Sequence, residues 1–176
     1  MEGDSGWLKD FVRDIPDFPR PGVVFKDLTP LLGDAEAFRF SVSSLADRFV
    51  DERISKVVGI EARGFIVAAP VAVQLHAGFV PVRKVGKLPW QTEQESYILE
   101  YGTDALEIHA DALGPGDRVL VVDDVMATGG TAAATVTLVE RLGASVAGLA
   151  FLIELGFLEG RRKLAGHSVT ALVRYE

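Results

Sequence analysis

The sequence predicts an α/β protein with a doubly wound, mostly parallel sheet, a β-hairpin flap and an amino-terminal arm. Short apolar segments rich in β-branched residues alternate with longer stretches of helical periodicity, which is typical of buried parallel strands joined by crossover helices. A polar stretch at about 85–111 breaks this alternation, and the chain is rich in proline through Pro21. The length of 176 residues suits one domain with a sizeable core, so residues 1–176 are predicted to fold as a single domain.

The arm covers about residues 1–33. It is predicted to begin with a helix near residues 6–13 and to continue as a proline-rich segment. Asp34 is the predicted N-cap of the next helix, at about 35–52, because an Asp side chain can accept hydrogen bonds from the free N–H groups of a first turn.

The core follows as alternating strands and helices. The strands are predicted at 56–60, 78–82, 118–122, 145–153 and 168–174, and the helices at 65–76 and 131–142. Crossovers between such parallel strands are right-handed. The flap at 85–111 contains a polar run at 91–96 and short alternating segments around 97–101 and 106–109, so it is predicted to be a β-hairpin that projects from the core.

The most informative stretch is 119–133, V-L-V-V-D-D-V-M-A-T-G-G-T-A-A. A buried strand is predicted to end on two adjacent carboxylates, and a Gly-rich loop then opens into a helix. The helix N-terminus offers free N–H groups and a partial positive charge, and the glycines let the backbone close on a phosphate. Carboxylates accept hydrogen bonds from a sugar diol. The pattern therefore indicates a phosphorylated sugar as ligand.

Each part of this stretch also has a purely structural interpretation. Two aspartates can be a solvated strand end, and T-G-G-T can be an ordinary tight turn. Their joint position at the carboxyl end of a parallel strand favours ligand binding. The chain has neither a G-x-x-x-x-G-K-[ST] nor a G-x-G-x-x-G motif, which argues against nucleotide hydrolysis and dinucleotide redox chemistry.

Composition narrows the class of protein. A net charge of −7 opposes binding to a nucleic-acid backbone, and no stretch approaches the roughly 20 apolar residues of a membrane span. The acidic start of the chain does not fit a signal peptide, and the absence of cysteine rules out thiol nucleophiles, disulfides and zinc–thiolate sites. We therefore expect a cytoplasmic protein with neither a nucleic-acid nor a membrane partner.

Positive charge is concentrated locally. Arg83, Lys84 and Lys87 lie close together, and Arg63 follows another predicted strand end, an arrangement that suits a polyanionic small substrate. The basic run at 161–163 is predicted to be solvated surface. The histidines have no spacing that suggests a metal site, and no role is assigned to Trp90.

The stretch at 119–133 resembles the phosphoribosyl diphosphate (PRPP) signature of the type I phosphoribosyltransferases. Other stretches resemble the adenine-specific members of that family. They are D-I-P-D-F-P at 14–19, P-G-V-V-F-K-D-L-T-P-L-L at 21–32, G-I-E-A-R-G-F at 59–65, R-K-V-G-K-L-P at 83–89, Y-I-L-E-Y-G at 97–102, and the end of the chain at 154–176. The resemblance begins near Ile15 and covers nearly the whole chain. The PRPP string alone would indicate only the superfamily, whereas the combination is specific to the adenine branch.

The resemblance implies transfer of the phosphoribosyl group of PRPP to adenine, with AMP and diphosphate as products. It implies the following site residues: Asp123 and Asp124 for the ribose hydroxyls; Ala127, Thr128, Gly129, Gly130 and Thr131 for the 5′-phosphate; Glu61, Ala62, Arg63, Arg83 and Lys87 for the diphosphate; and Val24, Phe25 and Lys26 for adenine. Glu100 would manage the proton of the attacking base, with Arg63 and Lys87 as further catalytic residues, and Tyr101 would help to close the flap.

Three further features are implied by the resemblance. The Glu61–Ala62 peptide is expected to be cis, although it does not precede proline. Mg²⁺ is expected as cofactor, held through PRPP oxygens and water near Asp123 and Asp124 rather than by direct protein ligands. A homodimer is expected, although the residues alone define no interface.

Several alternatives stay open at this stage. By itself, Phe25 in a V-V-F run is more typical of a core residue than of a stacking platform, and Glu100 could lie on a solvated strand face. Another acceptor base, such as guanine, xanthine or orotate, is possible. A PRPP-sensing regulator without catalysis is a further alternative, but the acidic charge and the lack of spare length for a DNA-binding module favour the enzyme.

Overall fold

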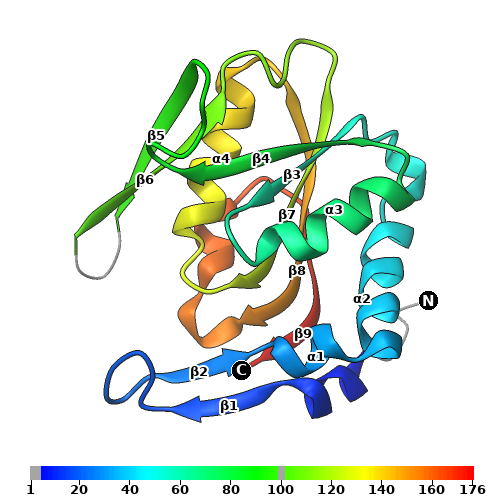
Figure 1. Cartoon of the computed structure of the whole chain (residues 1–176), viewed down its shortest axis with the longest axis vertical. Coiled ribbons are helices and arrows are strands. Elements are labelled where there is room, and N and C mark those ends of the chain that lie inside the picture. Colours follow the sequence, from blue (N-terminus) through cyan, green and yellow to red (C-terminus); the bar gives the residue numbers. More distant parts are fainter. Residues whose placement is uncertain (1–4, 99–101) are drawn as a thin grey trace.

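A mixed sheet forms the centre of the molecule (Figure 1). In this computed structural model, which describes residues 5–98 and 102–176, the sheet has seven strands in the order β5-β6-β4-β3-β7-β8-β9. The parallel strands are β3 (Lys56–Ile60), β4 (Gly78–Lys84), β7 (Arg118–Met126), β8 (Ser145–Leu155) and β9 (Val169–Tyr175). The helices are α1 (Thr29–Gly33), α2 (Ala35–Asp47), α3 (Gly64–Gln74) and α4 (Gly130–Arg141). The predicted doubly wound α/β fold is confirmed.

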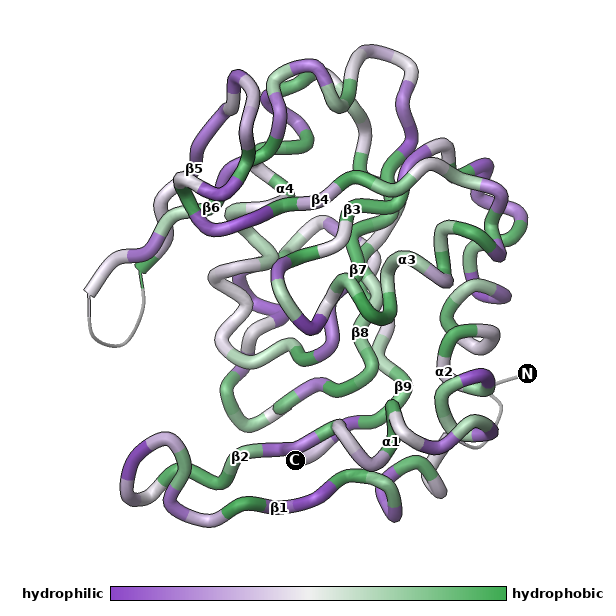
Figure 2. The backbone as a smooth tube through the Cα atoms, viewed as in Figure 1, coloured by the Kyte–Doolittle hydropathy of each residue, from purple (hydrophilic) through white to green (hydrophobic). Residues whose placement is uncertain are grey.

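Both faces of the sheet are buried, which explains the continuous apolar runs of its strands. Val57 and Leu120 pack with α2 and α3, whereas their neighbours Val58 and Val121 pack with α4. Figure 2 shows the hydrophobic colour along β3, β7 and β8, where the two layers of helices meet the sheet. Alternate residues of one strand thus belong to separate core clusters, as the period of a β-strand requires.

The order of the parallel strands creates a topological switch point between the central strands β3 and β7. From β3 the chain crosses to β4 on one side, and it later returns to form β7 on the other side. The connections on either side of β3 and β7 therefore diverge at the carboxyl ends of these two strands. Open α/β sheets bind ligands at such a switch point.

Helix boundaries differ from the prediction at the amino-terminal end. Asp34 is the N-cap of α2, since its carboxylate accepts hydrogen bonds from the N–H groups of Glu36 (3.0 Å) and Ala37 (2.9 Å). The helix predicted at 35–52 ends at Asp47, and a short 3₁₀ helix, η2 (Val50–Glu52), follows. The helix predicted at 6–13 is also a 3₁₀ helix, η1 (Gly6–Phe11).

The proline-rich arm contains a β-hairpin that the sequence analysis did not predict. Strand β1 (Arg13–Pro16) pairs antiparallel with β2 (Val24–Asp27). Lys26 of this hairpin bonds to Asp14 (2.6 Å) and lies over the ring of Tyr175 in β9, 4.1 Å from its centroid. The arm is thus anchored to the last strand of the sheet.

The flap is a β-hairpin, as predicted, and the predicted segment at 106–109 lies in its second strand, but its first strand begins earlier than predicted. The polar run at 91–96 belongs to β5 (Thr92–Ile98), which pairs with β6 (Thr103–His109). The sequence does not mark this strand, because its first five residues are all polar and show no alternation with apolar residues. Strand β6 also pairs with β4, so the flap continues the sheet. Within the described residues, no helix is both long and apolar enough to cross a membrane.

Candidate active site

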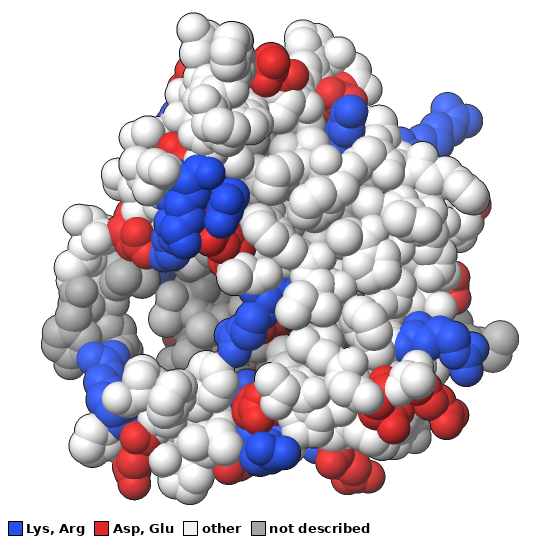
Figure 3. Space-filling model, in the orientation of Figure 1, with Lys and Arg blue, Asp and Glu red and all other residues white. Residues whose placement is uncertain are grey.

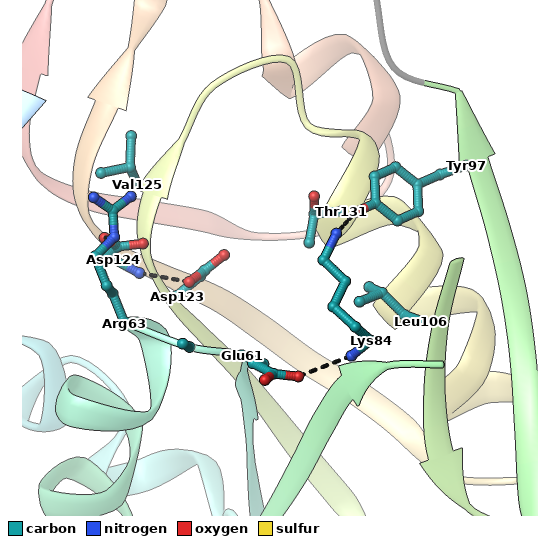
Figure 4. Close-up of a pocket in the computed structure, with 10 residues that line it drawn as sticks. Glu61, Arg63, Lys84, Tyr97, Leu106, Asp123, Asp124, Val125 and Thr131 are labelled. Atoms are coloured by element: carbon teal, nitrogen blue, oxygen red, sulfur yellow. Dashed lines mark hydrogen bonds and ion pairs between the residues drawn. The ribbon is translucent and has the colours of Figure 1, made fainter. Parts of the chain in front are cut away.

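Two segments meet at the switch point. The loop at 61–63 follows β3, and Asp123 and Asp124 lie in β7. Together with side chains from β4 and the flap they line a cavity of about 280 Å³ (Figure 4). Its lining residues are Glu61, Ala62, Arg63, Lys84, Tyr97, Leu106, Asp123, Asp124, Val125 and Thr131.

The two aspartates have different partners. The sequence predicted that this pair follows the end of the strand. Strand β7 instead extends to Met126, so the pair lies within it. The buried Asp124 carboxylate forms an ion pair with Nε of Arg63 at 2.7 Å. Asp123 accepts a hydrogen bond from the N–H of Asp124 at 2.9 Å, and its side chain points into the cavity (Figure 4). Both carboxylates thus line the cavity, with Asp124 held by Arg63 and Asp123 directed inward.

The surroundings of Asp123 favour its neutral form. Burial raises the pKa of Asp123 well above its ordinary value, and the adjacent negative charge of Asp124 raises it further. Gly64, the first residue of α3, permits this close packing. A Cβ at Gly64 would lie 2.5 Å from Oδ1 and 3.2 Å from Cα of Asp123, so no other residue fits.

Glu61 is surrounded by positive charge instead. Its carboxylate bonds to Nη2 of Arg83 (3.0 Å), Nζ of Lys87 (2.8 Å) and the N–H of Lys84 (2.9 Å). Burial alone would raise the pKa of Glu61, but the hydrogen bonds from Arg83 and Lys87 outweigh it and lower the pKa to about 2. Figure 3 shows basic and acidic side chains gathered where the end of β4 meets the flap. The Glu61–Ala62 peptide is cis, which confirms that prediction.

The Gly-rich loop is the third part of the site. Ala127 to Thr131 line an adjoining cavity of about 80 Å³, with Asp123 on its other side. Gly129 has a φ of 75° and is the N-cap of α4, so the free N–H groups of that helix begin at this loop. Such a helix start suits a phosphate group.

The arm brings Phe25 to the edge of the site. Phe25 is half-buried and belongs to neither core cluster, which removes the alternative of a core residue. Its ring packs edge-on against Phe18, with centroids 5.2 Å apart, and the guanidinium of Arg63 lies 5.1 Å from its centroid. Val24 is exposed, whereas the side chain of Lys26 is occupied by Asp14 and Tyr175.

Comparison with known proteins agrees with this geometry. The phosphoribosyl transferase domain family matches residues 32–167. An adenine phosphoribosyltransferase of Thermobifida fusca is 60% identical over 173 residues, which cover 98% of each chain. The chain belongs to the adenine phosphoribosyltransferase family.

Solved structures of adenine phosphoribosyltransferases share the fold over nearly the whole chain. The enzyme of Rhodothermus marinus has a TM-score of 0.93 at 55% identity and covers 98% of both chains. The Saccharomyces cerevisiae enzyme, solved with adenine and an imino-altritol bisphosphate, has a TM-score of 0.91 at 38% identity, with 98% of this chain and 99% of that chain covered.

Most of the residues predicted for an adenine phosphoribosyltransferase site lie together. The residues at 61–63, the aspartate pair and the loop at 127–131 line two adjoining cavities. Arg83 and Lys87 line neither cavity but form ion pairs with Glu61, and Phe25 lies against Arg63. Glu100 and Tyr101 lie outside the described residues.

The sequence indicated Lys84 only as part of a cationic cluster and gave no role to Glu107. Lys84 lines the main cavity, where its Nζ lies 3.0 Å from the hydroxyl of Tyr97 and pairs with Asp104. Its position between Arg83 and Lys87 was the available signal. Glu107 in β6 is buried, and its carboxylate accepts hydrogen bonds from the N–H groups of Lys87 (2.9 Å) and Leu88 (2.8 Å). No local pattern marks such an anchor.

Proposed function

We infer that this chain transfers the 5-phosphoribosyl group of PRPP to adenine, which forms AMP and releases diphosphate. The observation that carries this inference is the junction at the switch point, where a carboxylate pair, a phosphate loop and the cations Arg63 and Lys84 line adjoining cavities. Glu61, which also lines the main cavity, holds two further cations, Arg83 and Lys87. The spacing suits a ligand with a phosphate, a sugar diol and a second anionic group. Membership of the family and the adenine-bound yeast relative support adenine as the acceptor.

We assign the substrate contacts from this arrangement. The ribose hydroxyls bond to Asp123 and Asp124, and the 5′-phosphate binds the loop at 127–131. The diphosphate binds near the backbone of 61–62 and the side chains of Arg63, Arg83 and Lys87. The Glu61 carboxylate itself would repel an anion. Its role is to hold Arg83 and Lys87 beside the cavity until the diphosphate competes for them.

The arm is assigned to the base. The half-buried Phe25 ring lies beside Arg63 and can stack on adenine, while backbone groups of Val24 and Lys26 bond to the edge of the base. The side chain of Lys26 is held by Asp14 and Tyr175, so Lys26 contributes its backbone and not its ammonium group.

In the reaction, N9 of adenine forms a bond to C1 of the ribose while the bond from C1 to the diphosphate oxygen breaks. Positive charge builds on the sugar ring and negative charge on the diphosphate, which Arg63, Arg83 and Lys87 stabilise. Glu100 accepts the N9 proton. The flap, aided by Tyr101, covers the site and keeps water from the sugar carbon.

The donor set fits a Mg²⁺ ion that is held mainly by its substrate. Among the described residues no group of three or more His, Cys, Asp or Glu side chains could hold a metal alone. Asp123 and Asp124 both line the cavity and would hold the ion through water, with PRPP oxygens completing its coordination. When bound, it would offset the negative charge of the diphosphate. The raised pKa of Asp123 supports this assignment, because a nearby cation would stabilise the ionised form of its carboxylate.

A homodimer is proposed from the outer face of α3. This helix is apolar nearly all round, and a helix of that kind is normally covered on every side. Val73 (75% exposed) and Ile66 (45%) lie on its open face, and Phe79 of the neighbouring β4 is 39% exposed. A second copy of this chain is the proposed cover. A cytoplasmic location is proposed as well, because a cysteine-free sequence suits a reducing compartment.

One assay tests the function against its alternatives. Purified protein is given PRPP and Mg²⁺ with adenine, guanine, xanthine or orotate in turn, and diphosphate release is measured. Release with adenine alone is expected. Release with another base would change the acceptor, and binding of PRPP without release for any base would favour a sensor. The double variant Asp123→Asn, Asp124→Asn is the control and should lose activity at limiting PRPP.

A further inference from the structure

The segment between β8 and β9 packs directly behind the phosphate loop. It contains the 3₁₀ helices η3 (Gly156–Leu158) and η4 (Gly160–Leu164). The backbones of Gly129 and Gly160 touch. A Cβ on Gly129 would overlap the carbonyl oxygen of Gly160 and lie 3.1 Å from its carbonyl carbon, and a Cβ on Gly160 would lie 3.0 Å from the nitrogen of Gly129. No side chain fits between them, so the backbone at Gly160 limits how far the loop at 127–131 can move away from a bound phosphate.

Gly160 is followed by Arg161, whose guanidinium donates three hydrogen bonds to β8 and β9. The guanidinium of Arg161 forms a two-pronged ion pair with Glu154, with Nε–Oε1 and Nη2–Oε2 both 2.7 Å. Nη1 of Arg161 also donates to the carbonyl of Val169 at 2.9 Å. The Glu154 side chain is only 4% exposed. Arg161 lies at the exposed surface, as predicted, but its guanidinium is fixed by Glu154 and Val169, which the sequence did not indicate.

The anchor is close to the loop by strand pairing as well. Glu154 lies opposite Met126, and Met126 is the last residue of β7 before the phosphate loop starts at Ala127. The ion pair thus joins the end of β8, the start of η4 and β9, and it fixes Gly160 relative to β7. A two-pronged pair of arginine and carboxylate has a fixed orientation, which a lysine would not reproduce.

The next residue provides a natural comparison. Arg162 forms a surface ion pair with the neighbouring Glu159, at 2.7 Å, and its side chain is 77% exposed. Arg162 is therefore a matched control for Arg161: it has the same residue type and the same helix, but no link to β8 or β9.

We propose that Glu154, Arg161 and Gly160 are positioning residues for the 5′-phosphate, because they form a rigid support behind the loop at 127–131. The proposal rests on the function inferred above. Backbone N–H groups bind a phosphate well only when their directions are set before binding. Gly129 has a left-handed φ and no side chain, so it can move unless something behind it prevents this. The support supplies that restraint.

The test uses the 5′-phosphate as its own probe. Dissociation constants for AMP and adenosine are measured by calorimetry on wild type, Gly160→Ala, Arg161→Lys and Arg162→Lys. Their ratio reports the contribution of the phosphate. Gly160→Ala and Arg161→Lys should weaken AMP on the order of tenfold or more, the loss expected when a charge-assisted hydrogen bond is misplaced, with adenosine almost unchanged. Arg162→Lys should match wild type.

Each other outcome counts against the proposal. An unchanged ratio in a folded Arg161→Lys protein would overturn it, and so would an equal loss for adenosine, because that indicates general damage to the site. If Gly160→Ala does not fold, Arg161→Lys and Glu154→Gln decide. Failure of wild type to bind AMP more tightly than adenosine would instead overturn the proposed function. In steady-state assays the KM for PRPP should rise in the folded variants while the KM for adenine stays constant.

Discussion

At the scale of single residues, two carboxyl groups of the same cavity ionise differently. Glu61 is held by Arg83 and Lys87, and its pKa falls to about 2. Asp123 is buried beside Asp124, and its pKa rises. Both groups are removed from water, so the sign of the neighbouring charge decides the direction of each shift. Glu61 thus stays ionised and organises cations, whereas Asp123 gains most from a ligand that donates hydrogen bonds or brings positive charge.

The raised pKa of Asp123 predicts a shift in pH dependence. If ionised Asp123 binds the ribose, kcat/KM for PRPP falls as the pH drops through that pKa. In Asp124→Asn one cause of the rise is removed, so the pKa of Asp123 decreases and the acidic limb should move to lower pH. PRPP phosphates titrate identically with both proteins, so the displacement between the two profiles is the measurement. A limb that stays in place or moves to higher pH would contradict the assignment.

Glu100 is the proposed proton acceptor, and Glu100→Gln keeps its shape without that capacity. Turnover should fall by roughly 10²–10⁴-fold, the usual contribution of general acid–base catalysis, with little change in PRPP binding. Single-turnover kinetics measures the chemical step directly. Glu93→Gln is the control, because Glu93 is another acid of the flap and has only a 4.0 Å contact with Arg141. A chemical step as fast as wild type in Glu100→Gln would leave that residue with no proton role.

At the scale of elements, the flap shapes the cation cluster from behind. Its strand β6 pairs Glu107 with Arg83 of β4, and the buried Glu107 carboxylate then accepts the N–H groups of Lys87 and Leu88. Burial by itself would raise the pKa of Glu107, but the backbone hydrogen bonds from Leu88, Gly86 and Lys87 lower it. The turn that carries Lys87 is therefore held by the flap, so the two cannot move independently.

Replacing Glu107 by Gln tests this coupling. An amide accepts through one oxygen only and turns its NH₂ toward other donors, so unfolding free energy should fall by roughly 1–3 kcal/mol. The KM for PRPP should rise several-fold and the KM for adenine should not. Urea unfolding at several pH values adds a second check. Because its pKa is lowered in the folded protein, ionised Glu107 stabilises the fold fully above its unfolded pKa of about 4.3. That stabilisation is lost as the pH falls through the folded pKa. The difference in unfolding free energy between wild type and Glu107→Gln should therefore become smaller in acid. A constant difference would argue against an ionised anchor.

At the scale of the whole molecule, two hairpins extend from the core on the same side (Figure 1). The flap brings Tyr97 and Leu106 to the cavity, and the amino-terminal hairpin brings Phe25 to Arg63. The sheet thus supplies the PRPP site, and the hairpins supply the groups proposed to cover the site and bind the base.

The proposed dimer is tested on the exposed face of α3. Val73→Asp places a charge at its most exposed apolar position and should convert a dimer to a monomer at micromolar concentration, as measured by analytical ultracentrifugation. Val50→Asp, at a residue 67% exposed in η2, is the control and should stay dimeric. Because Val73 is exposed in the single chain, its replacement should leave the far-UV circular dichroism unchanged. A wild type that sediments as a monomer, or a dimeric Val73→Asp, would move the interface elsewhere.

The sequence by itself determined the alternation of strands and helices, the Asp34 cap, the flap as a hairpin and the loop at 127–131. These features depend on periodicity and on residues close together in the chain, so local patterns encode them. The cis peptide at Glu61–Ala62 came from resemblance to a family, because no local preference predicts it.

Only the tertiary structure decided which charged groups meet. Glu61 lies far along the chain from Arg83 and Lys87, Glu107 lies far from Lys87, and Glu154 reaches Arg161 only because η3 and η4 fold back under the phosphate loop. The sequence does not reveal strand β5 for a related reason, since its polar side chains bond to charged partners: Thr92 to Glu107, and Glu95 to Arg141 of α4. A polar side chain in a sequence has no preferred partner. The packing of distant elements selects one, and the protonation and position of the site depend on that selection.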